Sequence, residues 1–311
     1  MLCRIGARVG REKRLEPSLA QTLTRRIPLR IISEALPLVF GIALTAVIAC
    51  APAIAAEPEH VDIPDGELTL QASLYRPDGA GPFPAVVALH DCGGLVHHRP
   101  ITETRHYIEW ARLLVADGFV VLFPDSFGAR GIGPQCHERN RKVRASRERV
   151  SDANATRHWL QAQSYVKPDH VSLLGWSSGG TAALWTVRPT AAPRDGSTDF
   201  RSAVTFYPSC RRLHDTAWSA RVPTLILVGA ADDWTPASVC QQMVAGARDR
   251  SARVQIVVYP GAQHQFDRAN SPIRLHTGLF NTVDPAGRAH SGTNPAARAD
   301  ALKRVPEWLQ R

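Results

Sequence analysis

The residues of this sequence that are best suited to chemistry are Ser177, Asp232 and His264. A serine hydroxyl alone is a weak nucleophile, so it needs a base that a third group orients. His264 can remove the Ser177 proton, while Asp232 can hold the imidazole in the right tautomer and stabilise its charged form. These residue types therefore indicate nucleophilic catalysis through an acyl-enzyme that water later releases.

Ser177 belongs to the motif G-x-S-x-G, which spans residues 175–179. An apolar run that predicts a buried strand precedes the motif, and helix formers follow it at residues 181–185. In this context the motif forms a nucleophile elbow, where the glycines let strand and helix approach each other around a strained serine. The Ser178 N–H would then be free at the helix start to stabilise an oxyanion. The alternative is a glycine-rich turn with an incidental serine.

The candidate acid and base each follow a predicted strand end. Asp232 comes after a buried strand that ends at Val228, and His264 comes after one that ends at Val258. The order Ser, Asp, His is that of α/β hydrolases and differs from the orders in chymotrypsin and subtilisin. Asp233 is the competing acid, and Asp232 is preferred because it lies closer to the strand end.

A second oxyanion donor is expected at residues 90–94, where a buried strand at residues 85–89 runs into two glycines. An α/β hydrolase places its second oxyanion N–H at such a strand end, and Cys92 is the candidate. A plain strand-to-loop turn is the alternative. His90 is interpreted as a structural hydrogen-bonding residue rather than as the catalytic base.

Length and composition are those of a globular enzyme. The 311 residues suit one large α/β domain or two small ones, and 44% hydrophobic residues suit a substantial core. A formal charge of +9 would favour nucleic acid or a membrane as partner. However, residues 1–56 hold eight Lys or Arg and three Asp or Glu, a charge of +5, which leaves +4 for the remainder. A nucleic-acid partner is therefore discounted.

Residues 1–56 predict an export signal that is removed from a mature chain of residues 57–311. A basic region, an apolar run at residues 35–49 and small residues with A-x-A cleavage sites follow one another. Cleavage is expected after Ala55 or Ala56. The product is expected to be periplasmic or secreted, without a stable membrane span.

Three features of this leader leave alternatives open. The apolar stretch is about long enough for an uncleaved membrane anchor. Residues 24–30 resemble a twin-arginine export motif, although a proline stands where an aromatic residue is usual. Residues 47–50 loosely resemble a lipoprotein box, which would place a lipid on Cys50.

The cysteine count supports export. Removal of the leader leaves four cysteines, which in an oxidising compartment could form two disulfides in three possible pairings. No cysteine or histidine spacing matches a metal site, so neither zinc nor another cofactor is expected. The four residues are Cys92, Cys136, Cys210 and Cys240.

Apolar strands alternate with helical segments after the leader, which predicts one doubly wound, mostly parallel sheet with helices on both faces. An antiparallel hairpin at residues 60–75 is expected to open the sheet. Helices are expected at residues 101–116 and 296–310. Residues 268–297 lack periodicity and are expected to form a polar loop that flanks the site.

Residues 139–149 form a basic run that leads into an amphipathic helix. The arginines of this run could attract acidic substrates, or they could form a solvated helix face. The pattern favours the solvated face, which is the usual place of such a run.

The chain resembles the dienelactone hydrolase family of α/β hydrolases over roughly residues 60–310. The resemblance implies the α/β-hydrolase fold in a single domain and the hydrolysis of small-molecule esters or lactones. The namesake enzymes have a cysteine in the elbow, and the serine of this chain suggests broader carboxylic-ester or lactone hydrolysis. The motifs behind the resemblance are residues 90–94, 124–127 and 175–180, Gly229 with Asp232 and Pro236, and residues 264–267.

The same resemblance implies a disulfide between Cys210 and Cys240. In the α/β-hydrolase arrangement the strands before these two residues are neighbours, so both cysteines would lie at the carboxyl edge of the sheet. The argument could also join Cys92 to Cys136, which lie on longer, glycine-rich loops. Four buried free thiols are the alternative.

Together these features predict an exported serine hydrolase of carboxylic esters or lactones. A serine peptidase of the prolyl-oligopeptidase type shares the elbow and the residue order. Such peptidases usually carry an N-terminal propeller, for which about 255 mature residues leave no room. A non-catalytic binding protein with this fold is a third hypothesis, although a decayed enzyme would often have lost Ser177, Asp232 or His264.

Overall fold

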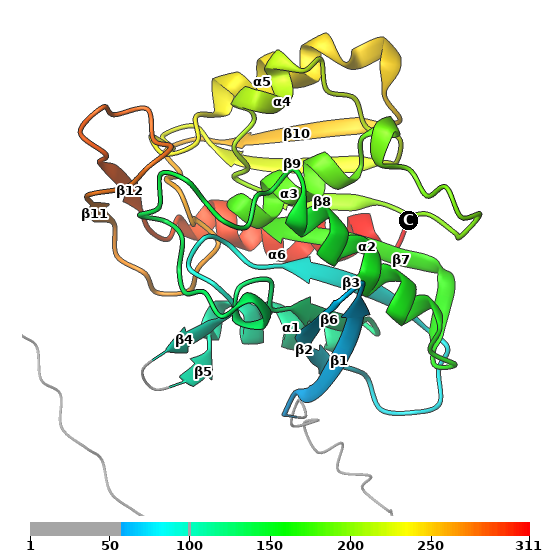
Figure 1. Ribbon diagram of the computed structural model, residues 1–311. Helices are drawn as coiled ribbons and strands as arrows, with labels where there is room; N and C mark the ends of the chain where they lie inside the picture. The colour runs from blue at the N-terminus through cyan, green and yellow to red at the C-terminus, as the bar shows by residue number, and fades with distance from the viewer. Residues whose placement is uncertain (1–56, 99–100) are drawn as a thin grey trace, which may run out of the picture. The chain divides into compact units, whose positions relative to one another are not determined.

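The computed structural model describes residues 57–98 and 101–311, and an eight-stranded sheet organises this part of the chain (Figure 1). The export signal predicted in residues 1–56, with Cys50, lies outside the described residues. Among the helices that the structure describes, none has the length and apolar character needed to span a bilayer.

The central sheet is mixed but mostly parallel. Its strands are β1 (Glu59–Asp65), β2 (Leu68–Tyr75), β3 (Phe83–Leu89), β6 (Val120–Pro124), β7 (Val166–Trp176), β8 (Ala203–Phe206), β9 (Thr224–Gly229) and β10 (Val254–Tyr259). Their order is β1-β2-β6-β3-β7-β8-β9-β10, and only the pairs β1–β2 and β2–β6 are antiparallel. β6, β8 and β9 are buried along their whole length, because helices cover both faces. The predicted doubly wound sheet, opened by a hairpin, is confirmed.

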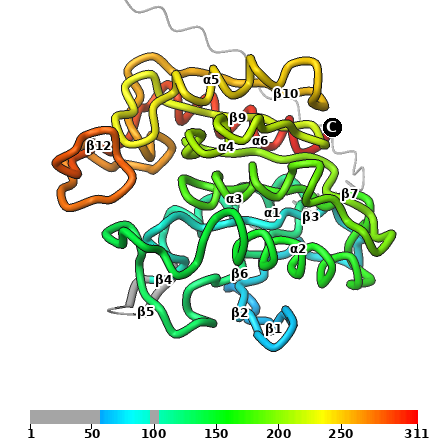
Figure 2. Tube along the Cα trace, turned by 45° about the horizontal axis from the view of Figure 1, so that its top comes forward, coloured from blue at the N-terminus to red at the C-terminus, as the bar shows by residue number. Residues whose placement is uncertain are grey.

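Helices form a layer on each face of the sheet (Figures 1 and 2). The α-helices are α1 (Arg105–Ala116), α2 (Glu148–Gln161), α3 (Ser178–Thr186), α4 (Arg211–Asp215), α5 (Ala237–Gly246) and α6 (Pro295–Leu309), with 3-10 turns η1 (Gly128–Arg130), η2 (Pro189–Ala191) and η3 (Arg248–Arg250). α1 and α6 pack on one face, and α2, α3 and α5 pack on the other. Successive side chains of β7 alternate between the layers, so Leu173 faces α2 and α3 while Leu174 faces α1 and α6.

The helix predicted at residues 101–116 is shorter in the structure. α1 begins at Arg105, because the residues before it form β5 (Ile101–Glu103), which pairs with β4 (Val96–His98). Thr104, the residue before the helix, keeps an extended backbone with φ −66° and ψ 122°. A three-residue strand is too short to show a period-2 pattern, so the sequence does not distinguish it from the helix that follows.

The segment at residues 268–297 is not an unstructured polar loop as predicted. It contains β11 (Arg274–His276) and β12 (Ala289–Ser291), which pair antiparallel. Ser291 also bridges to His264, and the Gly292 N–H donates a hydrogen bond of 3.0 Å to the His264 carbonyl. The segment therefore lies directly beside the candidate base.

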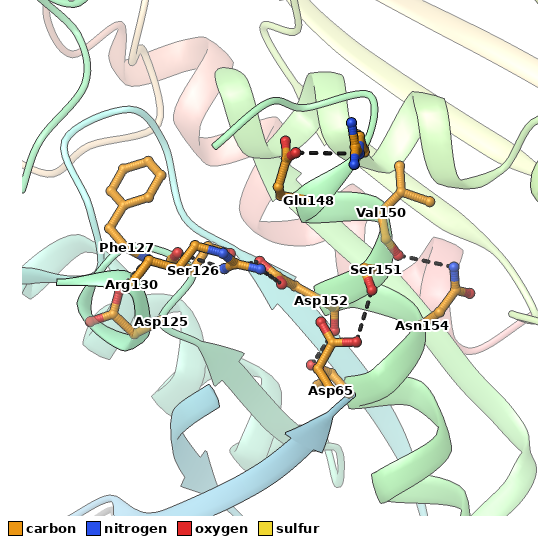
Figure 3. A network of polar contacts seen from close by, with 12 residues as sticks. Asp65, Asp125, Ser126, Phe127, Arg130, Glu148, Val150, Ser151, Asp152 and Asn154 are labelled. Atoms are coloured by element: carbon orange, nitrogen blue, oxygen red, sulfur yellow. Dashed lines mark hydrogen bonds and ion pairs between the residues drawn. The ribbon is translucent and has the colours of Figure 1, made fainter. Parts of the chain in front are cut away.

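Hydrogen bonds tie the start of α2 to two other parts of the fold (Figure 3). Arg130, in the turn after β6, donates two hydrogen bonds to Asp152, of 3.1 and 2.7 Å, and one of 2.8 Å to the Ser126 carbonyl. Ser151 donates a hydrogen bond of 2.8 Å to Asp65 at the end of β1. The long segment between β6 and α2 spans residues 125–147. Arg130 fixes its beginning to α2, and the bond from Ser151 to Asp65 fixes the helix that follows its end.

Two disulfides join loops at the carboxyl edge of the sheet. Cys210, directly before α4, is bonded to Cys240 in α5 with an S–S distance of 2.03 Å. Cys92, after β3, is bonded to Cys136 with an S–S distance of 2.02 Å. The structure thus contains the pairing implied for Cys210 and the second pairing considered for Cys92, and none of the four is a free thiol.

We expect the double replacement Cys210→Ser and Cys240→Ser to destabilise the protein by about 3–4 kcal/mol, the chain-entropy estimate for such a loop. The bridge joins residues with a sequence separation of 30. Urea denaturation of the variant and of the wild-type protein under oxidising conditions measures the difference. A loss below about 1 kcal/mol would show that the bridge adds little to stability.

Candidate active site

Ser177 lies in the turn between β7 and α3, where its backbone has φ 50° and ψ −114°. Residues other than glycine rarely adopt a positive φ, and such strain costs about 1–3 kcal/mol. The Ser177 N–H donates to the Phe206 carbonyl at 2.9 Å, and the Thr181 N–H donates to the Ser177 carbonyl at 2.8 Å. These bonds hold the strained serine at the carboxyl edge of the sheet.

The two glycines of the motif are required by close backbone contacts. A Cβ at Gly175 would lie 2.4 Å from the Gly179 carbonyl oxygen, and a Cβ at Gly179 would lie 2.1 Å from the Leu89 carbonyl oxygen. Both distances are far below van der Waals contact, and the atoms met belong to the backbone. The spacing G-x-S-x-G therefore follows from the packing of this turn on itself and on the end of β3.

Ser177, His264 and Asp232 form a continuous hydrogen-bonded chain. Ser177 Oγ lies 3.0 Å from His264 Nε2, and His264 Nδ1 lies 2.8 Å from Asp232 Oδ2. Because a carboxylate only accepts, Nδ1–H donates to Asp232 and Nε2 is left to accept the Ser177 hydroxyl. His264 is buried between the rings of Tyr207 and Trp234, whose centroids lie 4.5 and 4.7 Å from its own.

The Asp232 carboxylate is held by its own loop. Its Oδ1 accepts the N–H groups of Trp234 and Thr235 at 2.9 and 2.8 Å, and Thr235 Oγ1 lies 3.0 Å from its Oδ2. Thr235 has no role in the sequence-based prediction. Aspartates commonly accept the backbone N–H groups of the residues two and three positions later. The pattern D-x-x-T, directly before the proline that precedes α5, could therefore have identified Thr235 from the sequence.

Asp233, the competing acid, points elsewhere. Its Oδ1 accepts the His290 N–H at 2.7 Å, and its Oδ2 lies 2.7 Å from His290 Nδ1. The structure therefore brings Asp232 to His264 and uses Asp233 to hold β12.

The candidate oxyanion donors come from two neighbouring elements. Ser178 is the first residue of α3, and Cys92 follows β3, which pairs with β7 in the sheet. Asp91 fixes the loop at Cys92, because its Oδ1 accepts the Gly93 N–H at 2.7 Å. Within the described part of the chain, neither the Cys92 nor the Ser178 N–H donates to a protein acceptor. Both residues line the same cavity as Ser177.

His90 is buried and structural, as the sequence predicts. Its Nδ1 lies 2.8 Å from the Asp91 carbonyl, and its Nε2 accepts the Ser126 N–H at 3.3 Å. Burial, with the nearby Arg149 cation, lowers the pKa of His90 to about 3. Arg149 is itself buried and donates to the His90 carbonyl at 2.7 Å. His90 is thus a neutral ring that links the candidate oxyanion loop to its neighbours.

A buried carboxylate, Asp267, follows His264 by three residues. Its Oδ2 accepts the indole N–H groups of Trp110 and Trp176, each at 2.9 Å, and its Oδ1 accepts the Tyr207 hydroxyl at 2.8 Å. Burial and the Asp267 charge raise the pKa of Tyr207 well above its usual value, so this hydroxyl remains a donor. The sequence places Asp267 in a motif but gives no sign of these partners, because they come from distant segments.

A cavity of about 550 Å³ opens at Ser177. Its lining combines apolar side chains, such as Trp185 and Val239, with several arginines. Among the described residues, no group of three or more His, Cys, Asp or Glu could hold a metal ion. The cavity is large enough for a small organic ester and brings it to the Ser177 hydroxyl.

The basic run at residues 139–149 does not form the solvated helix face that the pattern favoured. α2 begins only at Glu148, and Arg149 on that helix is 1% exposed. Arg139, Arg141 and Arg144 precede the helix and line the cavity. The helix part of the prediction is therefore wrong, whereas the solvated part holds for the exposed Arg139, Lys142, Arg144 and Arg147.

The sheet order and the turn at Ser177 define an α/β-hydrolase fold. The family model of the dienelactone hydrolase family matches residues 70–311, and the chain belongs to this family. It is therefore a hydrolase that acts on ester or lactone bonds.

Known relatives agree with this assignment. A Synechocystis sp. protein named "putative carboxymethylenebutenolidase" is 25% identical over 224 residues, 66% of this chain and 85% of that protein. The crystal structure of a dienelactone hydrolase-like promiscuous phosphotriesterase from metagenomic libraries has a TM-score of 0.59 at 20% identity, covering 82% of this chain and 98% of that one. The Pyrococcus horikoshii acylaminoacyl peptidase has a TM-score of 0.59 at 14% identity, covering 84% of this chain and 42% of the peptidase. The two solved structures show the shared fold alone.

We expect Asp267→Asn to destabilise the protein by about 1–3 kcal/mol, the usual cost of leaving a buried donor unsatisfied. A carboxamide presents an N–H₂ group where the carboxylate presents an oxygen, so at least one of its three donors loses its acceptor. Thermal and urea denaturation measure the loss. Asp249→Asn is the matched control, since Asp249 is exposed and should tolerate the same change. Equal stability of the two variants would contradict a structural role for Asp267.

Proposed function

We propose that the protein is a serine hydrolase of small carboxylic esters or lactones, with Ser177 as nucleophile, His264 as general base and Asp232 as the orienting acid. The observation behind this proposal is the hydrogen-bonded chain from Ser177 Oγ to His264 Nε2, 3.0 Å, and from His264 Nδ1 to Asp232 Oδ2, 2.8 Å. A nucleophile, a base and an orienting group in this geometry form the functional unit of serine hydrolases.

In the proposed mechanism His264 accepts the Ser177 proton as Oγ attacks the carbonyl carbon of the ester. The resulting oxyanion accepts hydrogen bonds from the N–H groups of Cys92 and Ser178, which have no other protein acceptor in the described residues. Protonated His264 then returns its proton to the leaving alcohol, which leaves an acyl-enzyme. Water, deprotonated by His264, releases the acid and restores Ser177.

We also propose that the enzyme acts outside the cytoplasm, as residues 57–311 after removal of the export signal. The two disulfides of the structure support this, because disulfides persist mainly in oxidising compartments. Lipid attachment at Cys50 remains an alternative to full release.

A serine peptidase is the second candidate function, because the fold is also that of an acylaminoacyl peptidase. That peptidase is about twice as long, since the alignment covers 84% of this chain and only 42% of the peptidase. Short-chain esters and lactones, compared with aminoacyl peptides, discriminate between the two candidates.

Ser177→Ala is expected to remove ester hydrolysis, because no other nucleophile is hydrogen-bonded to His264 Nε2 among the described residues. The loss in kcat should reach several orders of magnitude, on the order of 10⁶ in a comparable enzyme. A fluorophosphonate probe should label the wild-type protein and not the variant. Near-wild-type turnover in a folded Ser177→Ala protein would mean that Ser177 is not the nucleophile, and an unlabelled, inactive wild type would favour the non-catalytic hypothesis.

Asp232→Asn is expected to lower kcat by roughly 10⁴, because an amide no longer selects the required His264 tautomer. Asp233→Asn is the matched control, since Asp233 bonds to His290 and not to His264. Steady-state kinetics on one chromogenic ester compares the two variants. A larger loss for Asp233→Asn would reassign the acid.

A further inference from the structure

One of the two disulfides lies in the candidate oxyanion loop. Cys92, whose backbone N–H is a candidate oxyanion donor, is bonded through its side chain to Cys136, 44 residues further along the chain. Gly93 and Gly94 follow Cys92 directly, and a glycine has no side chain that could fix its position. Next to the candidate donor, the loop is therefore anchored by the side chains of Asp91 and Cys92.

The segment at the other end of this bridge is itself held by hydrogen bonds. Gln135, directly before the second cysteine, donates its backbone N–H to the Cys92 carbonyl at 2.8 Å. The Gln135 side-chain oxygen accepts the Lys142 N–H at 2.9 Å, and its carbonyl accepts the Arg141 Nε–H at 3.1 Å. The bridge thus attaches the candidate oxyanion loop to a segment whose own position is fixed.

The same bridge lies in a small apolar cluster that is separate from the two large clusters of the sheet layers. Trp234 of this cluster packs on the His264 ring, with the centroids 4.7 Å apart, and follows Asp232 by two residues. The cluster therefore joins the candidate oxyanion loop to the loop of the candidate acid and to the segment that contains β11 and β12. Its members are Cys92, Trp234, Leu279 and Ala289, with Cys136 packed against them.

The second disulfide has different surroundings. Cys210 and Cys240 belong to the large cluster between the sheet and α2, α3 and α5, and they are 2% and 0% exposed. Neither residue supplies a group to the proposed mechanism. Cys136, by contrast, is half-buried, so that its sulfur is the more accessible to a reagent. The two bridges can therefore be distinguished by experiment.

We propose that Cys92 and Cys136 are positioning residues for ester hydrolysis, because their disulfide holds the Cys92 N–H where the oxyanion forms. The inference rests on the proposed function of Ser177 and of the oxyanion loop. A donor stabilises an oxyanion best when it is oriented before the reaction, since no free energy is then spent on moving it. A covalent bridge restricts the loop in the substrate-free enzyme and so meets this requirement.

The double variant Cys92→Ser and Cys136→Ser removes the bridge but keeps the backbone N–H of residue 92. A change in rate therefore reports the position of the donor and not its loss. For 4-nitrophenyl butyrate, kcat should fall by about 10–100-fold, which is less than the loss of about 10²–10³-fold that follows removal of an oxyanion donor. KM should change by less than about 3-fold, because the oxyanion is present in the transition state and not in the bound ester.

An aryl trifluoromethyl ketone reports the oxyanion directly, because its adduct with Ser177 carries the negative oxygen. Its Ki should rise in the variant by the same factor by which kcat/KM falls. Cys210→Ser with Cys240→Ser is the matched control, since it removes a bridge of similar sequence separation, 30 against 44 residues. Both variants are compared at a temperature at which circular dichroism shows each to be folded.

The loss of kcat should be at least about tenfold larger without the Cys92–Cys136 bridge than in the control. Equal losses in the two variants, or a wild-type Ki for the ketone without that bridge, would overturn the proposal. Fluorophosphonate labelling separates positioning from partial unfolding: every chain that lacks the Cys92–Cys136 bridge should be labelled at Ser177, at a lower rate than wild type. Labelling of only a fraction of the chains, at the wild-type rate, would show a purely structural role and contradict the proposal.

A second measurement uses the wild-type protein and applies even if the variant does not fold. Dithiothreitol opens a disulfide by thiolate attack on one sulfur and then closes to its own cyclic disulfide, so two electrons and two protons pass to the cysteines. Its concentration is raised until alkylation and mass spectrometry show Cys92 and Cys136 as thiols while Cys210 and Cys240, which are buried, remain bonded.

In this titration kcat should fall in step with the opened fraction and return on reoxidation. Full activity in chains whose Cys92–Cys136 bridge is open would overturn the proposal. A wild-type protein that neither hydrolyses esters nor reacts with the fluorophosphonate would instead contradict the proposed hydrolase function.

Discussion

The packing of the Ser177 turn against the end of β3 is the contact on which the rest of the site depends. Gly175 pairs with Leu89 in the sheet, and Gly179 lies so close to the Leu89 carbonyl that no side chain fits between them. Ser178, the first residue of α3, and Cys92, in the loop after β3, line the same cavity as Ser177. The register of adjacent strands thus sets where both segments leave the sheet, and the Asp91 side chain and the Cys92–Cys136 disulfide then hold the loop at Cys92.

The Asp267 carboxylate has a comparable role near His264, since Tyr207 contacts both residues. Its partners Trp110, Trp176 and Tyr207 belong to α1, the end of β7 and the residue after β8. A buried charge with three donors allows little choice of geometry, since each donor that moves away loses its acceptor. The residue before Ser177 and the ring that packs on His264 are therefore held by the same carboxylate.

The sequence predicts most of the sheet and the three central site residues, because both depend on local patterns. Apolar runs define the strands, and Ser177, Asp232 and His264 each follow one of them. The partners of Asp267 are separated from it by up to 157 residues, and no local pattern reports such contacts. The same holds for Arg141, whose place in the cavity depends on Gln135 and on the bridge to Cys92. Strands of three residues, such as β11 and β12, are too short to be recognised.

The backbone at Ser177 has a conformation that glycine adopts more readily than serine. A glycine would adopt φ 50° and ψ −114° with little strain, so replacement of Ser177 by glycine would make the turn easier to form. Selection for stability alone would therefore favour glycine over serine at this position. Under the proposed mechanism, selection for the reaction offsets this thermodynamic disadvantage of Ser177.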